Sequence, residues 1–100
     1  MTAQEIEELR DAYLARHNIN WDPSADYLRN VDDAIEEAAA SLRKIAANPE
    51  LSPTGDSIRG LCVEYAWYIM EHRKPEFEQD YASDLLILRL TEGFGCGKSE

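Results

Sequence analysis

The segment from Ile58 to Arg73, IRGLCVEYAWYIMEHR, constrains the fold of this chain more than any other. Apolar residues recur along it at helical spacing, and others widen that side until little polar surface remains: Ile58, Leu61, Cys62, Val63, Tyr65, Ala66, Trp67, Tyr68, Ile69 and Met70. A helix that is apolar nearly all round is normally buried. At about 16 residues it is also too short to cross a bilayer. We therefore expect a central core helix, around which the rest of the chain packs.

Two amphipathic helices are expected before it. Residues 2–16 begin with Thr2 and Glu5, the spacing of a capping box. Residues 23–47 follow Asp22, a residue type suited to the helix N-cap, with proline at the first helical position. The apolar positions of this second helix alternate in steps of three and four, as in a packed helix seam: Leu28, Val31, Ile35, Ala38, Leu42 and Ile45.

The core helix is expected over residues 57–74, capped by Asp56 or Ser57, and Pro75 opens a last helix over residues 75–91. The run LLILRL near its end would also suit a short strand. Helix is favoured because the spacing from Phe77 onward is helical and the chain offers no second strand. The sequence thus predicts an all-α fold: a small four-helix bundle in a single domain, residues 1–92, with a short flexible glycine-rich tail, residues 93–100.

Composition limits the function classes. The chain has 100 residues, of which 20 are acidic and 10 basic, for a net charge of −10. An acidic protein of this kind is not held to nucleic acid or anionic lipid by its overall field. The sequence shows neither a signal peptide nor a transmembrane run. Two cysteines without a secretory signal indicate free thiols in a reducing compartment.

The residue types that could bind a metal or phosphate, or act in catalysis, do not occur at the spacing that such sites require. The zinc-type residues lack the close ligand pairs of zinc sites: His17, Cys62, His72 and Cys96. Gly97-Lys98-Ser99 imitates a phosphate-binding loop, but the motif's first glycine would fall at Glu92. Asp80 and Asp84 are one helical turn apart, a weak basis for a cation site. No nucleophile–base arrangement is present, so we expect no cofactor, no metal and no enzyme.

Several charged and aromatic positions allow two explanations, a structural role within the fold or contact with a partner. Glu64 is expected on a solvated strip of the core helix, or paired with Arg59, Arg73 or Arg89. The second helix carries an acidic outer face that is either simply solvated or repels or complements a charged partner: Asp32, Asp33, Glu36 and Glu37. Three aromatic residues are candidates for contact with a partner protein: Trp21, Tyr27 and Phe94. Trp21 would alternatively cover the core as part of a loop.

The apolar and aromatic pattern of most of residues 5–90 resembles a known family. The runs that carry the resemblance are RGLCVEYAWYI (59–69), EFEQDYASDLLILRL (76–90) and, in the second helix, Asp26-Tyr27-Leu28 followed by DDAIEEA (32–38). They are similar to the small head–tail connector, or adaptor, proteins of tailed double-stranded DNA bacteriophages. Related proteins occur in prophages and in phage-derived gene transfer particles.

The resemblance implies a structural virion protein at the neck of the particle, made in the host cytoplasm. Such proteins form a ring, usually a dodecamer, that docks on the portal protein, extends the DNA exit channel and offers a platform for tail, stopper or terminator proteins. DNA passes through without sequence-specific binding, and no membrane is involved. An acidic channel wall would repel the DNA backbone as it moves. The competing class is an acidic monomeric or dimeric interaction protein, either a DNA mimic or a regulatory binder.

Overall fold

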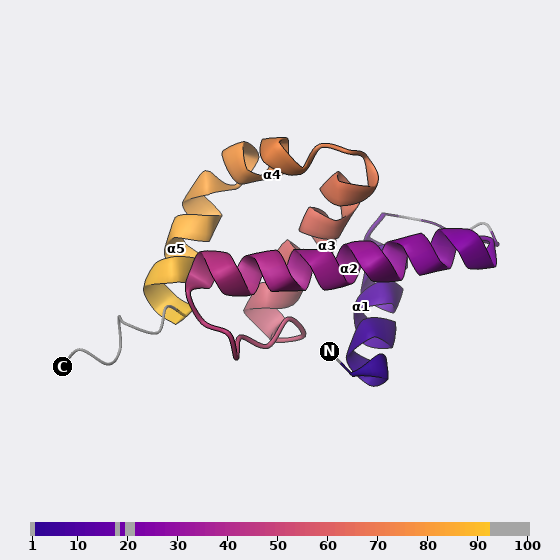
Figure 1. Cartoon of the computed structure of the whole chain (residues 1–100), viewed down its shortest axis with the longest axis horizontal. Coiled ribbons are helices and arrows are strands. Elements are labelled where there is room, and N and C mark those ends of the chain that lie inside the picture. Colours follow the sequence, from indigo (N-terminus) through magenta and orange to yellow (C-terminus); the bar gives the residue numbers. More distant parts are fainter. Residues whose placement is uncertain (1, 18, 20–21, 93–100) are drawn as a thin grey trace.

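The computed structural model describes residues 2–17, 19 and 22–92, with backbone alone at residues 56, 57 and 92. All regular structure in this part of the chain is helical (Figure 1). The helices are α1 (Ala3–Arg16), α2 (Ala25–Ala46), α3 (Asp56–Met70), α4 (Lys74–Asp80) and α5 (Ala82–Glu92). The predicted all-α class is confirmed, whereas the predicted tail, residues 93–100, lies outside the described residues.

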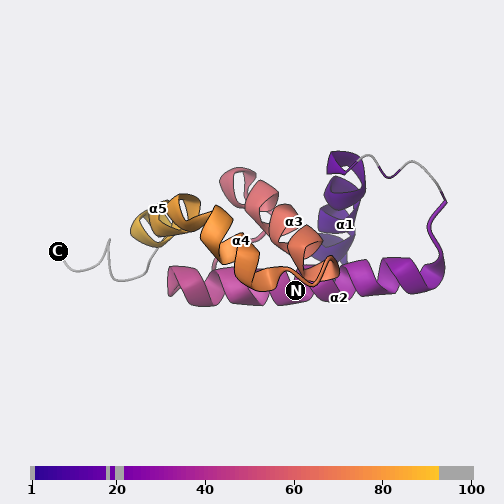
Figure 2. The same ribbon diagram turned by 90° about the horizontal axis from the view of Figure 1, so that it is seen from above.

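The long helix α2 forms one layer of a flat molecule that measures 50 × 28 × 17 Å. Helices α1, α3 and α5 lie on one side of it (Figure 2). The side chains that α2 buries follow the predicted spacing and include small residues that allow close packing: Val31, Ala34, Ile35, Ala38, Ala39, Leu42 and Ala46. Because no helix among the described residues covers the other side of α2, that side faces solvent.

Helix α3 is the core helix that its sequence predicts. Every side chain from Ile58 to Met70 is buried or half-buried. It packs against α1, α2 and α4, and α5 packs mainly against α2 instead. The enclosure of α3 is therefore incomplete, and one strip of it stays open beside α5.

Helix starts agree with the sequence at α1 and differ at α2 and α3. Thr2 and Glu5 form the predicted capping box, with hydrogen bonds of 3.0 and 3.1 Å. The prediction of Asp22 as the N-cap of α2 is wrong, because Ser24 Oγ accepts the hydrogen bond from the Tyr27 amide. At α3 the N-cap is Gly55, which has no side chain to accept a capping bond. Aspartate and serine are comparably good N-caps, so residue type alone does not tell which of the two begins α2.

The end of α3 comes earlier than residue 74. His72 adopts a left-handed conformation with φ 59°, and the amide of Arg73 donates to the Tyr68 carbonyl at 2.7 Å. Together with the bond from His72 to the Ile69 carbonyl, at 3.0 Å, this is a Schellman motif. The Arg73 guanidinium also lies over the Tyr68 ring, 5.0 Å from its centroid. These contacts explain why the turn forms before Pro75 is reached.

The predicted last helix, residues 75–91, is two helices that meet at Tyr81. Backbone hydrogen bonds continue across the junction, from Tyr81 to Phe77 and from Leu85 to Tyr81. Phe77 is buried and stacks on Tyr65 at 4.1 Å and on Tyr81 at 4.6 Å between ring centroids. The aromatic cluster holds α4 on α3, while Leu85 and Leu88 turn α5 into the core. The kink thus comes from packing on two different helices.

Candidate functional site

The open strip of α3 forms the floor of a groove of about 360 Å³. No residue of α2 lines it, and its walls come from α5 and from the end of α1. Its lining is mixed, with apolar side chains beside charged and hydroxyl groups: Arg16, Ile58, Gly60, Leu61, Glu64, Tyr81, Asp84, Ile87, Leu88 and Thr91. Such a surface suits an amphipathic partner better than a fully apolar ligand.

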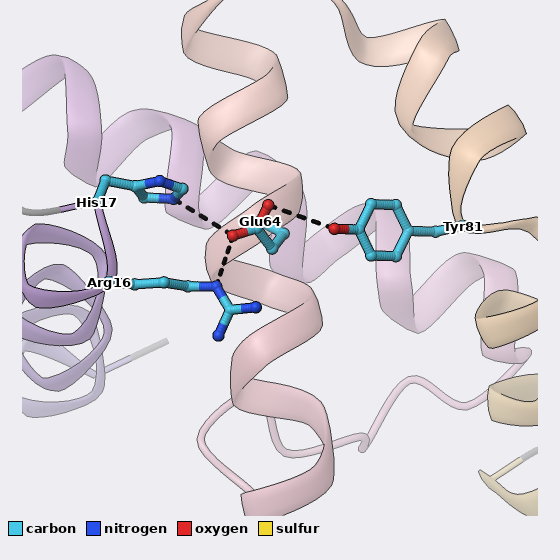
Figure 3. A network of polar contacts seen from close by, with 4 residues as sticks. All are labelled: Arg16, His17, Glu64 and Tyr81. Atoms are coloured by element: carbon cyan, nitrogen blue, oxygen red, sulfur yellow. Dashed lines mark hydrogen bonds and ion pairs between the residues drawn. The ribbon is translucent and has the colours of Figure 1, made fainter.

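Glu64 links three parts of the chain across the groove (Figure 3). Its carboxylate forms an ion pair with Arg16 Nε and lies 3.6 Å from His17 Nε2. The Tyr81 hydroxyl donates to the other carboxylate oxygen at 3.4 Å. The sequence did not predict these partners, because Arg59, Arg73 and Arg89 were the bases expected to pair with Glu64. The carboxylate tethers the end of α1 and the α4–α5 junction to α3.

The imidazole ring of His17 packs against aromatic side chains and is largely shielded from solvent. It stacks on Trp67 with 4.1 Å between centroids and an interplanar angle of 13°, and it lies 5.1 Å from the Tyr13 ring. Burial lowers the pKa of His17 below its ordinary value, although the Glu64 carboxylate opposes this shift. Burial likewise raises the pKa of the Tyr13 phenol, and the nearby Tyr27 phenol adds to the effect. Both rings therefore stay neutral at neutral pH.

Protonation of His17 is expected to weaken the fold as the pH falls below about 6.5. A histidine whose folded-state pKa is lowered binds its proton more readily when unfolded, so its contribution is complete above the unfolded pKa and falls as the pH drops below it. Urea unfolding of the wild type and of His17→Gln over this range checks the prediction. An equal pH slope in the two proteins would contradict it.

The outer face of α5 is apolar although it points away from the core. Leu86, Ile87 and Leu90 are 59%, 57% and 58% exposed, and they are the large hydrophobic side chains that stand exposed in the described chain. At 3.6 residues per turn, Leu86 and Leu90 lie across the helix from the buried Leu85 and Leu88. An exposed helix that is apolar on opposite sides is typical of a contact surface. We call Leu86, Ile87 and Leu90 the α5 patch.

The predicted acidic face is divided in the structure. Asp32 is half-buried and pairs with Arg10 of α1 at 3.0 Å; burial raises its pKa, and Arg10 opposes the shift. Glu37 is exposed and pairs with Lys74 at 2.9 Å. Asp33 and Glu36 are exposed on α2 and form no ion pair with another described residue. The outward acidic surface therefore consists of Asp33, Glu36 and Glu37.

The three aromatic candidates for a partner contact are placed only in part. Tyr27 is half-buried and packs against the core beside Tyr13, so only part of its ring is open to a partner. Trp21 and Phe94 lie outside the described residues. The interface role of all three stays a prediction. The sequence did not mark Leu86, Ile87 and Leu90 as a contact surface, although four consecutive apolar residues, 85–88, leave no polar side to this part of the helix.

The described residues contain no group of three or more metal-ligating side chains close enough to hold an ion. Asp80 accepts a hydrogen bond from the Tyr68 hydroxyl at 2.9 Å, whereas Asp84 lies in the groove. Cys62 is buried, and burial raises the pKa of its thiol to about 12, so little reactive thiolate forms at neutral pH. No helix in the described part of the chain is both long enough and apolar enough to span a bilayer.

Comparisons with protein-family models, with curated proteins and with solved structures find no match to the chain. The groove, the α5 patch and the acidic side of α2 are therefore the features from which a function can be inferred.

Proposed function

We propose that the chain is a structural subunit of the head–tail connector of a tailed phage or phage-derived particle. In this role, copies form a ring that docks on the portal protein, extends the DNA exit channel and receives the tail. The observation that carries the proposal is the α5 patch, because exposed large apolar side chains gathered on one short helix are typical of a surface that contacts another protein. The flat, elongated shape also gives neighbouring subunits broad sides for contact.

The charge distribution suits a subunit past which DNA moves. The net charge is −10, and the open side of α2 carries Asp33, Glu36 and Glu37. The basic residues nearest to helix ends are largely engaged within the chain: Arg43 donates to the Leu51 carbonyl at 2.9 Å, Arg73 pairs with Glu76 at 2.8 Å and Lys74 pairs with Glu37. In the proposed ring the open side of α2 faces the channel, where it repels the phosphate backbone.

Reconstitution on heads tests the connector proposal. Purified chain is mixed with portal-containing heads that lack it, and the heads are sedimented and imaged. We expect many copies of the chain at each portal vertex, between the portal and the tail. Heads lacking a portal are the matched control and should recover none. If the chain stayed in the supernatant with both kinds of head, the connector proposal would fail.

The second candidate is an acidic binder that occupies a basic groove of another protein. It is favoured by Asp33, Glu36 and Glu37, which recur at helical spacing on an uncovered side of α2. Exposed Lys44 and Arg29 on the same helix weaken it, because they interrupt the acidic surface. Asp33→Asn with Glu36→Gln separates the two functions. A DNA mimic would lose its partner through these changes, whereas a connector would still bind portal-containing heads.

A further inference from the structure

We propose that the α5 patch of one copy docks into the groove of the next copy, and that this head-to-tail contact, repeated, closes the ring. The inference rests on the proposed function and names the two surfaces by which its subunits meet. The donor surface is Leu86 and Leu90 of the α5 patch. The acceptor is the groove between α3 and α5, which Ile87, the third residue of the patch, lines from its own side.

The size of the α5 patch favours a contact between two different surfaces. Three half-exposed side chains cover at most a few hundred Å². A standard interface buries about 800 Å² on each partner, so a two-fold contact of the patch with itself would be too small for a stable dimer. In a closed head-to-tail ring every subunit makes two contacts, one through its patch and one through its groove, and so buries more surface than it would in a patch-to-patch dimer. Such a contact also closes into rings, as a two-fold contact does not.

The groove has the shape and lining to receive aliphatic side chains. Its apolar walls are Ile58, Leu61, Ile87 and Leu88. A protein cavity of about 150 Å³ is enough to hold a benzene molecule, so the groove, at about 360 Å³, has room for both leucines of a neighbouring α5.

Gly60 gives an independent reason to expect an occupant. It lies inside α3 and lines the groove, where glycine costs about 1 kcal/mol of stability relative to alanine. A Cβ atom at this position would come no closer than 3.7 Å to its nearest neighbour, Arg16 Nη1, which is an ordinary contact. Nothing packed within the described chain therefore requires glycine here. A helix from another copy that approaches the groove floor does require a small residue.

Charge also points to a second copy as the occupant. Each copy carries −10, so two copies repel each other over most of their surfaces. Residues 82–91, which contain the patch, hold one acid, Asp84, and one base, Arg89, and so carry no net charge. In the groove, the Glu64 carboxylate is paired with Arg16, which leaves Asp84 as the additional acidic side chain of its lining. These two surfaces therefore meet with less repulsion than the acidic side of α2 would impose.

Two variants with intact folds separate the donor surface from the acceptor. Leu86→Gln with Leu90→Gln removes the donor surface, leaves Ile87 in the groove wall and changes no charge, and both positions are exposed. Gly60→Gln fills the groove floor, where a Cβ has ordinary contacts. Ala40→Gln, at an exposed position of α2, is the matched control. The full-length proteins are compared by sedimentation velocity and native mass spectrometry, free and on portal-containing heads, after thermal melts confirm folding.

We expect the wild type and Ala40→Gln to form closed oligomers, and each variant alone to associate about 100-fold more weakly. An equal mixture of the two variants should give one-to-one heterodimers and nothing larger, since only one patch and one groove remain intact between them. If Gly60→Gln alone assembled like the wild type, the groove would not be the acceptor, and the ring proposal would stand. A wild type that stayed monomeric both in solution and on heads would overturn both proposals.

Discussion

Replacing Phe77 with alanine is expected to lower the free energy of unfolding by about 3 to 5 kcal/mol, the largest effect of any single change considered. Phe77 is fully buried and stacks between Tyr65 and Tyr81, with Tyr68 edge-on at 5.4 Å. Removing the ring loses its apolar burial and leaves a cavity among three aromatic neighbours. A domain of this size has about 5 to 15 kcal/mol in total, so the loss is a large part of it. Urea unfolding followed by circular dichroism at pH 7 measures the change.

Two further variants make the Phe77 result specific. Phe77→Leu keeps an apolar side chain in the site and should cost clearly less than alanine does. Gln79→Ala lies on the exposed side of the same helix and should change the free energy of unfolding by no more than about 0.5 kcal/mol. A loss of under 1 kcal/mol in Phe77→Ala would show that the aromatic cluster does not hold α4 and α5 in place.

The sequence predicts correctly those features that depend on residues close together along one helix. The capping box at Thr2 and Glu5, the buried stripe of α2 and the apolar character of α3 all follow from residue spacing along one helix. The helix ends are different. Asp22 and Ser24 are comparable capping residues, so residue type alone does not tell that α2 begins after Ser24.

The kink at Tyr81 and the groove could not be read from spacing, because both depend on which helix packs against which. No glycine or proline marks Tyr81; the junction arises because Phe77 packs on α3 while Leu85 and Leu88 enter the core beside α2. The periodicity that predicted one helix is correct on both sides of the break. Since α5 then lies mainly on α2, a strip of α3 stays open, and the groove is a product of tertiary packing alone.

The partners of the charged residues also depend on packing between helices rather than on spacing along one helix. Glu64 was expected to find a base at or after the core helix, yet its partner Arg16 is 48 residues earlier in the chain. Asp32 shares an acidic sequence run with Asp33 but faces α1 and pairs with Arg10. Helical spacing gives the face on which a residue lies, and the neighbour that covers that face decides whether the charge stays solvated.

The second large effect is expected at the small residues of α2. Ala38 is fully buried, and Ala34 and Ala39 beside it are 3% and 2% exposed. Replacing Ala38 with leucine adds three carbon atoms where the interior has no room, which forces side chains off their preferred rotamers or moves α2 away from its neighbours. We expect a loss of about 2 to 3 kcal/mol in the free energy of unfolding, measured by urea titration. The melting temperature should fall by at least about 8 °C, as for other domains of this length.

Ala40 supplies a control on the same helix with the same chemical change. It is exposed on the open side of α2, so Ala40→Leu should alter the free energy of unfolding by no more than about 0.5 kcal/mol. Alanine and leucine have similar helix propensities, and the difference between the two variants therefore isolates packing from helix formation. Equal losses in Ala38→Leu and Ala40→Leu would mean that α2 is covered on both sides, which would also remove the solvent-facing acidic surface from the proposed channel.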